Sequence, residues 1–172
     1  MDIERRLIEG NLKFLKGIEI DNEKKEKLHE LMNGQHPYAL VITCSDSRVV
    51  PEHIFDCREG ELFVIRSAGN VINEGELATL EYGIEHLHIQ YVLVLGHTHC
   101  GAVNAAMNHE KGQYLSPILS RIERAISFNE LETTKANALA QVKYIKERFP
   151  HYDGSIVAGI YDIENNKVEL IK

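Results

Sequence analysis

Two cysteines and one histidine in this sequence have the donor types and the placement of a zinc site: Cys44, His97 and Cys100. Cys44 ends an apolar run of strand length, and the other two residues directly follow a later run of the same kind. Ligands of an open parallel sheet bind beyond the carboxyl ends of the strands, so we expect these side chains to converge there. Thiolate and imidazole suit Zn²⁺, and a set of three leaves a fourth position available, as catalytic zinc sites do. The pattern therefore predicts a Zn²⁺ site of the catalytic rather than the structural kind.

Asp46 and Arg48 follow Cys44 at two-residue steps. An alternative interpretation makes Cys44 an ordinary buried strand residue and His97 a capping side chain. A carboxylate and a guanidinium at the end of an apolar strand weaken that alternative, because such groups have no obvious packing role there. A thiol-phosphatase site is also disfavoured, since three residues between Cys44 and Arg48 are too few for a phosphate-binding loop. Cys57 fits no part of the pattern and is interpreted as an incidental thiol.

The rest of the chain supplies elements that could hold these groups. Apolar runs of strand length cover residues 38–44, 62–66 and 91–96, and helical periodicity covers 2–17, 21–33, 74–88, 101–110, 116–128 and 130–149. Such alternation is typical of βαβ units and of a parallel sheet that helices cover on both faces. Residues 155–163 and 167–171 are expected to add a hairpin at the sheet edge. The predicted fold class is α/β, with a mainly parallel β-sheet flanked by helices.

Composition limits the classes of partner. The 172 residues carry a formal net charge of −7, which disfavours binding to nucleic acid. No apolar run approaches the roughly 18 residues that a membrane helix needs. Three cysteines are too few for a disulfide framework. We therefore expect a single cytoplasmic domain without a nucleic-acid or membrane partner.

Three segments resemble the signature blocks of the β-class carbonic anhydrases: CSDSRV at 44–49, ELFVIRSAGNV at 61–71 and GHTHCGAV at 96–103. The resemblance implies that the zinc ligands are Cys44, His97 and Cys100. It implies that Asp46 and Arg48 form the catalytic dyad. It also implies a closed state in which Asp46 leaves Arg48 and becomes a fourth zinc ligand.

The resemblance further implies a substrate pocket made of Gln35, Phe63, Ala68, Tyr82 and Gly101. Gln35 would hydrogen-bond a substrate oxygen, and Phe63, Ala68 and Tyr82 would form a dry apolar wall, although ordinary core packing would also explain Phe63 and Tyr82. In the family the equivalents of Gln35 and Tyr82 come from the neighbouring subunit, which implies a homodimer or a higher oligomer built from dimers. A helical arm, 1–34, would pack on the partner, and 35–172 would form the α/β core of the single domain.

The activity that the resemblance implies is the reversible hydration of carbon dioxide to bicarbonate and a proton by zinc-bound hydroxide. Hydrolysis of carbon disulfide or carbonyl sulfide on the same scaffold is one alternative. A structural zinc protein with Asp46 as a permanent fourth ligand is another. His99, which lies between two predicted ligands, is expected to point away from the metal, with proton relay as the alternative. Activity is expected to climb through mildly alkaline pH.

Overall fold

The computed structural model describes residues 2–172, which form two compact units. The first unit ends at Gln35, and the second runs from His36 to Lys172. Among the described residues, no helix combines the length and the apolar character that crossing a membrane requires. Each unit is described by itself below.

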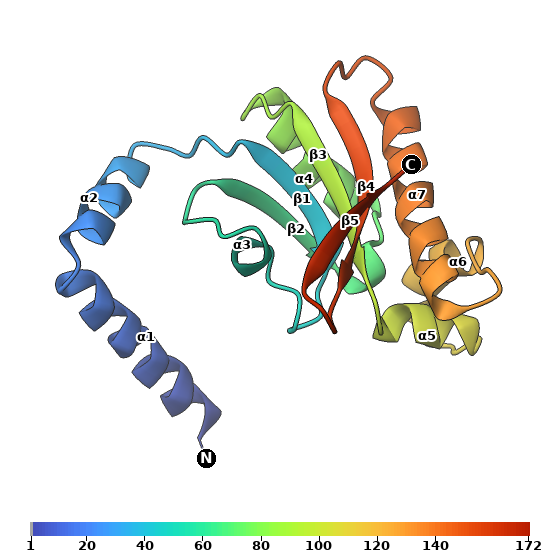
Figure 1. Cartoon of the computed structure of the whole chain (residues 1–172), viewed down its shortest axis with the longest axis horizontal. Helices are drawn as coiled ribbons and strands as arrows, with labels where there is room; N and C mark the ends of the chain where they lie inside the picture. The colour runs from blue at the N-terminus through green and yellow to red at the C-terminus, as the bar shows by residue number, and fades with distance from the viewer. Residues whose placement is uncertain (1) are drawn as a thin grey trace. The chain divides into compact units, whose positions relative to one another are not determined.

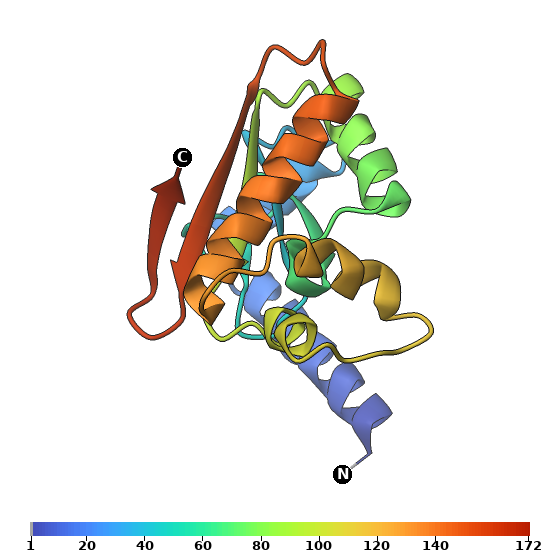
Figure 2. The same ribbon diagram turned by 90° about the vertical axis from the view of Figure 1, so that its right-hand side faces the viewer.

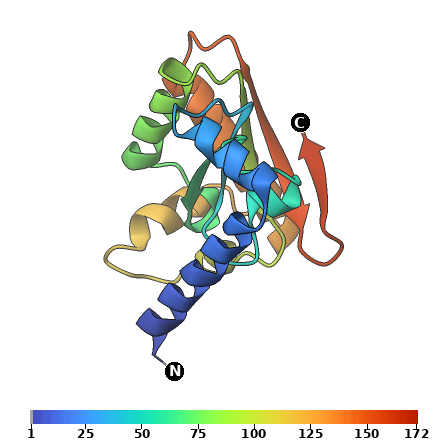
Figure 3. The same ribbon diagram turned by 90° about the vertical axis from the view of Figure 1, so that its left-hand side faces the viewer.

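The first unit contains two helices, α1 (Ile3–Glu19) and α2 (Asn22–Leu31), drawn in blue in Figure 3. Each begins where sequence analysis expects it, because an aspartate caps it: Asp2 accepts a hydrogen bond from the amide of Glu4, and Asp21 from the amide of Lys24. Neither helix contains a buried residue. The exposed apolar side chains of α1 include Ile3, Leu7, Ile8, Leu12, Phe14 and Leu15. Within the described chain, α1 therefore leaves a large apolar surface uncovered.

The second unit is built on a five-stranded sheet with the order β2-β1-β3-β4-β5 (Figure 1). The strands are β1 (Ala39–Cys44), β2 (Leu62–Ser67), β3 (Tyr91–His97), β4 (Ser155–Asp162) and β5 (Lys167–Ile171). Only the β4–β5 pairing is antiparallel. The predicted mainly parallel sheet and the C-terminal hairpin are both confirmed. Because β1 and β3 are parallel neighbours, their carboxyl ends lie side by side.

Helices α4 (Glu74–Glu85) and α7 (Glu130–Arg148) lie on the same face of the sheet, which Figure 2 shows nearly edge-on. Alternate strand residues point to these helices, so Leu40 and Ile42 of β1 share a core with Leu80 of α4 and Ile145 of α7. Burial of such side chains contributes about 1.5–3 kcal/mol each. This face holds the main core of the unit.

The opposite face differs from the expectation that helices cover both faces. Val41 and Leu93 point to this side, where the short helix α3 (Pro51–Ile54) and its neighbour Phe55 pack on them. An apolar cavity of about 550 Å³ lies beside them, lined in part by Tyr38, Val168 and Leu170. Within the second unit, the four-residue helix α3 is therefore the helix that packs on this face, and it covers only a small part of it. Four residues are too few for a visible helical period, which is why the sequence did not reveal α3.

Three short elements follow the ends of the strands. A turn of 3₁₀ helix, Ala68–Asn70, follows β2, and α5 (Gly101–Met107) follows β3. Helix α6 (Ser116–Glu123) ends earlier than the expected 116–128. Residues 124–125 form a turn instead of continuing the helix, and Asn129 caps the next helix by accepting a hydrogen bond from the amide of Glu132. These elements surround the carboxyl ends of β1 and β3.

Candidate metal centre

The structure brings the three predicted ligands together. One ligand atom each of Cys44, His97 and Cys100 lies within 4.8 Å of the others. Cys44 ends β1, His97 ends β3, and Cys100 directly precedes α5. The parallel register that pairs Thr43 with Leu95 fixes this meeting, because it aligns the two strand ends. All three residues are at most 5% exposed, so a cation held here is shielded from bulk water.

The imidazole of His97 is oriented as a metal ligand. Its Nδ1–H donates to the carbonyl oxygen of Thr98 at 2.8 Å, which leaves the lone pair on Nε2. Nε2 is buried and has no hydrogen-bond partner within the described part of the chain. A buried acceptor without a partner is costly, and coordination of a cation removes that cost. Two thiols and this nitrogen form the donor set that zinc prefers, so these residues fit Zn²⁺.

The environment of the two thiols favours negative charge. Hydrogen bonds lower the pKa of Cys44 to about 4; the largest effect comes from the Cys100 thiol, and burial opposes it. The backbone N–H of Gly69 contributes by donating to the sulfur of Cys44 at 3.2 Å. The pKa of Cys100 is raised, because its thiol donates to the Cys44 thiolate and because it is buried. The pair therefore holds one negative charge on Cys44, and a divalent cation would favour a second on Cys100.

The charge of Cys44 also acts on His97. Burial lowers the pKa of His97, but the Cys44 thiolate, the Thr98 carbonyl and the Asp46 carboxylate together raise it by more, so the net pKa lies above the ordinary value. A cation at this point would reverse that balance, because it repels the imidazolium form and binds the neutral ring. A metal ion at this site would therefore neutralise the negative charge of the thiolates and bind the neutral imidazole.

Asp46 and Arg48 form a bidentate ion pair beside the three ligands. Arg48 Nε donates to Asp46 Oδ1 at 2.9 Å, and one terminal nitrogen of Arg48 donates to Oδ2 at 2.7 Å. The Arg48 side chain is the main reason why the pKa of Asp46 lies far below its usual value. Oδ2 lies 4.0 Å from Nε2 of His97. An ionised carboxylate is thus held at the edge of the ligand group.

Arg66 is a residue of this region that sequence analysis missed. Its guanidinium donates to three backbone carbonyl oxygens, those of Cys44 (3.3 Å), Asp46 (2.7 Å) and Val49 (2.8 Å). These bonds fix the turn that carries Cys44 and Asp46. The available signal was a single arginine at the end of the apolar run LFVIR, the same kind of signal that singled out Arg48.

A second set of missed residues lies on α7. The side-chain amide of Asn137 donates to the carbonyl oxygen of Gly69 at 2.8 Å, and the Gln141 amide donates to Oδ1 of Asn137 at 3.1 Å. Both amides are buried. They hold the backbone whose N–H faces Cys44. A polar residue in a helical period carries no sequence signal of such a contact.

The expected pocket residues lie as follows. Phe63 is half-buried on β2, and the centre of its ring lies 6.1 Å from that of Tyr82, which is 47% exposed on α4. Ala68 begins the 3₁₀ turn, and Gly101 is the exposed first residue of α5. Gln35 is exposed and belongs to the first unit. Within the second unit the structure therefore brings Phe63 and Tyr82 together.

Comparison with known proteins agrees with this geometry. A family model described as carbonic anhydrase matches residues 39–149. The carbonic anhydrase of Synechocystis sp. is 34% identical over 172 residues, which cover 96% of this chain and 58% of that protein. Carbonic anhydrase 2 of Mycobacterium tuberculosis is 33% identical over 186 residues, covering 96% of this chain and 90% of that protein. The solved structure of the β-carbonic anhydrase CcaA has a TM-score of 0.85 at 32% identity, covering 99% of this chain and 96% of that chain.

A Cys–His–Cys group beyond the carboxyl ends of parallel strands defines an α/β protein with a metal-binding site. The chain belongs to the β-carbonic anhydrase family. The expected family and fold class are thereby confirmed, and Zn²⁺, the expected cofactor, suits the ligand set. The chain spans 58% of the length of its Synechocystis relative, against 90% of the mycobacterial one.

Proposed function

We propose that this protein catalyses the reversible hydration of carbon dioxide to bicarbonate and a proton, as the resemblance of its motifs implies. The observation that carries the proposal is an ionised carboxylate, Asp46, held 4.0 Å from Nε2 of His97 at the edge of the Cys–His–Cys group. Zinc, when bound, supplies the Lewis acidity that lets water ionise close to neutral pH. The protein must then orient the nucleophile, exclude competing water and hold the substrate.

Asp46 is assigned the orienting role. Its depressed pKa keeps it ionised at neutral pH, so it can only accept hydrogen bonds. It would accept one from the nucleophile and so direct a lone pair toward the carbon atom of carbon dioxide. Arg48 keeps Asp46 ionised and occupies both of its oxygens, which keeps the carboxylate turned from the ligands. Release of this pair would let Asp46 become the fourth ligand of a closed state.

The apolar residues are assigned the substrate wall. Phe63 and Tyr82 lie near one another, and with Ala68 they would give a non-polar gas a dry surface. The Gln35 amide would donate to a substrate oxygen, and Gly101 would leave room for the substrate because a Cβ at this position would meet no atom within 4 Å. Removing any one apolar group should weaken substrate use without loss of the metal.

The active form is proposed to be a homodimer, or a larger assembly of dimers, with the first unit as an arm within one domain. Helix α1 supports this because it exposes a row of apolar side chains and has no buried residue. Burying such a surface on a second copy would stabilise the dimer. The cysteines Cys44, Cys57 and Cys100 are all free thiols, which supports a reducing compartment such as the cytoplasm.

The experiment is carbon dioxide hydration measured by stopped flow with the zinc-loaded protein, with Asp46→Asn beside it. We expect activity in the unchanged protein and a loss of about 10²–10⁴-fold in kcat for Asp46→Asn, with zinc content retained. Parallel assays with carbon disulfide and carbonyl sulfide test the hydrolase alternatives. Inactivity toward carbon dioxide in a fully zinc-loaded protein would refute the proposal. A structural site is disfavoured because both oxygens of Asp46 are bound to Arg48.

A further inference from the structure

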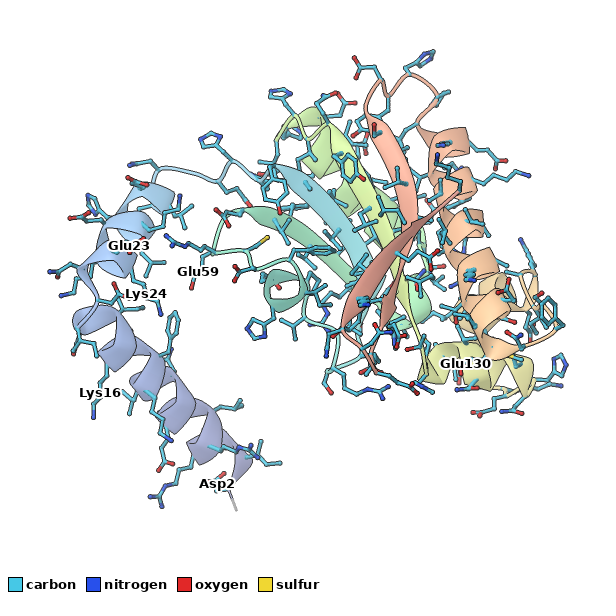
Figure 4. The ribbon with its side chains drawn as sticks, viewed as in Figure 1. Asp2, Lys16, Glu23, Lys24, Glu59 and Glu130 are labelled. Atoms are coloured by element: carbon cyan, nitrogen blue, oxygen red, sulfur yellow. The ribbon has the colours of Figure 1, made fainter. Side chains whose placement is uncertain are left out.

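Glu130, the first residue of α7, contacts the backbone of a zinc ligand. Its Oε1 accepts a hydrogen bond from the backbone N–H of Cys100 at 3.1 Å. Figure 4 shows Glu130 at the start of α7, beside α5. The Glu130 side chain is only 28% exposed, so this bond is partly shielded from water. It ties a helix that follows later in the chain to the residue that carries one of the two thiols.

The same carboxylate faces His99, the residue between the two ligands of this loop. Its second oxygen lies 3.9 Å from Nδ1 of His99, while Nε2–H of His99 donates to Glu164 Oε1 at 2.9 Å. The ring therefore points to carboxylates from α7 and from the β4–β5 hairpin, as expected of a side chain turned away from the metal. His99 has a φ of +57°, a backbone conformation that favours glycine. The hydrogen bond between this side chain and Glu164 helps to keep the loop in this conformation.

The loop is also joined to the Asp46–Arg48 pair. The terminal nitrogen of Arg48 that binds Asp46 Oδ2 also donates to the carbonyl oxygen of His99 at 3.1 Å. A shift of the loop would therefore move a zinc ligand and, at the same time, the acceptor that steadies Arg48. Ligand placement and carboxylate placement thus depend on one short backbone segment, 97–100.

We propose that Glu130 is a positioning residue of the metal centre, which holds the backbone of Cys100 through the hydrogen bond from its N–H. The inference rests on the proposed zinc site and goes beyond it, because it assigns a function to the carboxylate that begins α7. Residues that orient a metal ligand without touching the metal typically change metal affinity by about 10–100-fold when removed. Glu130 holds its ligand through the backbone, and a similar loss is expected.

The experiment measures the rate at which the zinc-loaded protein releases zinc to a chromophoric chelator. Glu130→Ala should release zinc about 10-fold faster or more, and Glu130→Gln should stay near the unchanged rate because its amide oxygen can still accept from Cys100. Glu132→Ala is the matched control: it also removes a carboxylate from the first turn of α7, but the partner of that carboxylate is Lys135. Thermal unfolding of each metal-free variant separates a loss of fold from a loss of ligand placement.

A cobalt-substituted sample gives a second measurement that does not depend on activity. The thiolate-to-cobalt charge-transfer absorption should change in Glu130→Ala and stay unchanged in Glu132→Ala. If Glu130→Ala fails to fold, Glu130→Asp keeps the charge in the first turn and withdraws the carboxylate by one methylene, so it should also speed zinc release.

Equal release rates in Glu130→Ala and Glu132→Ala, or an unchanged rate in Glu130→Asp, would overturn the inference while the zinc site stands. An unchanged protein that binds no zinc would instead refute the proposed function, and this inference with it.

Discussion

Substitution of Gly69 by alanine should disturb both stability and the metal centre. Gly69 has a φ of +65°, a conformation that costs an L side chain about 1–2 kcal/mol. A Cβ added there would lie 2.8 Å from Cδ1 of Ile122 and 3.1 Å from Cβ of Ala102. Overpacking of this kind costs about 1–3 kcal/mol, and the stiffer unfolded chain offsets about 0.4–1 kcal/mol. The expected net loss in the free energy of unfolding is about 3 kcal/mol.

The same substitution should weaken the hold on zinc. To relieve the contact with Ile122 the backbone must move, and its N–H, which now donates to Cys44 Sγ at 3.2 Å, would move with it. A thiolate that loses this bond is less stabilised, so zinc should leave Gly69→Ala faster than the unchanged protein. Urea unfolding measures the first effect, and zinc transfer to a chelator measures the second.

Gly75→Ala is the matched control for this experiment. Gly75 lies in the first turn of α4, where an added Cβ would meet no atom within 4 Å. Alanine should stabilise that helix by about 0.5–1 kcal/mol and leave zinc release unchanged. If the free energy of unfolding of Gly69→Ala lies within about 0.5 kcal/mol of that of the unchanged protein, the close packing and the positive φ at Gly69 do not have the energetic cost expected here.

Three further outcomes are expected. Asn137→Ala leaves the buried carbonyl oxygen of Gly69 without its donor and should lower the free energy of unfolding by about 1–3 kcal/mol; an unaltered urea midpoint would argue against that role. The hydrogen bond with Cys57 raises the pKa of Tyr38 to about 12, so the stability it contributes is full below the ordinary value of 10.0 and lost as pH rises through about 12. Burial also raises the pKa of Tyr152, so absorbance titration should show Tyr38 ionising late in addition to Tyr152, and only the Tyr38 signal should return toward the ordinary value in Cys57→Ala; an identical titration in Cys57→Ala would show that the bond is absent. Carbon dioxide hydration should rise between about pH 6 and 9 because the nucleophile must lose a proton, while Asp46, whose pKa is depressed by Arg48, is already ionised throughout; a flat rate profile would contradict this.

The sequence was sufficient to predict the parts of the site that lie at strand ends. Cys44 and His97 each end a strand of nearly continuous apolar residues, and the α/β alternation requires such ends to meet at one edge of the sheet. Asp46 was predicted for the same reason, as a charged residue placed just beyond a strand. For these residues the local sequence pattern and the topology of the sheet predict the same position, at the carboxyl ends of the strands.

The residues that hold those ligands were not predictable. Glu130 begins a helix and Asn137 lies within one, and at such positions a carboxylate or an amide has ordinary explanations. Their contacts with Cys100 and Gly69 come from the way α7 packs on the sheet, which no local period encodes. Gly69 itself appears in the sequence as one more glycine, and only its φ and its neighbours reveal why no side chain fits there.

The parallel pairing of β1 with β3 also has a consequence for the order of events during folding. Cys44 and His97 lie far apart in the chain, and only the register between these two strands brings them within reach of one ion. Only His97 and Cys100 are close in the chain, so a nascent chain has no local segment that carries the complete ligand set. Three-ligand binding of the ion therefore requires β1 and β3 to be paired, so zinc stabilises the assembled sheet rather than a local segment of the unfolded chain.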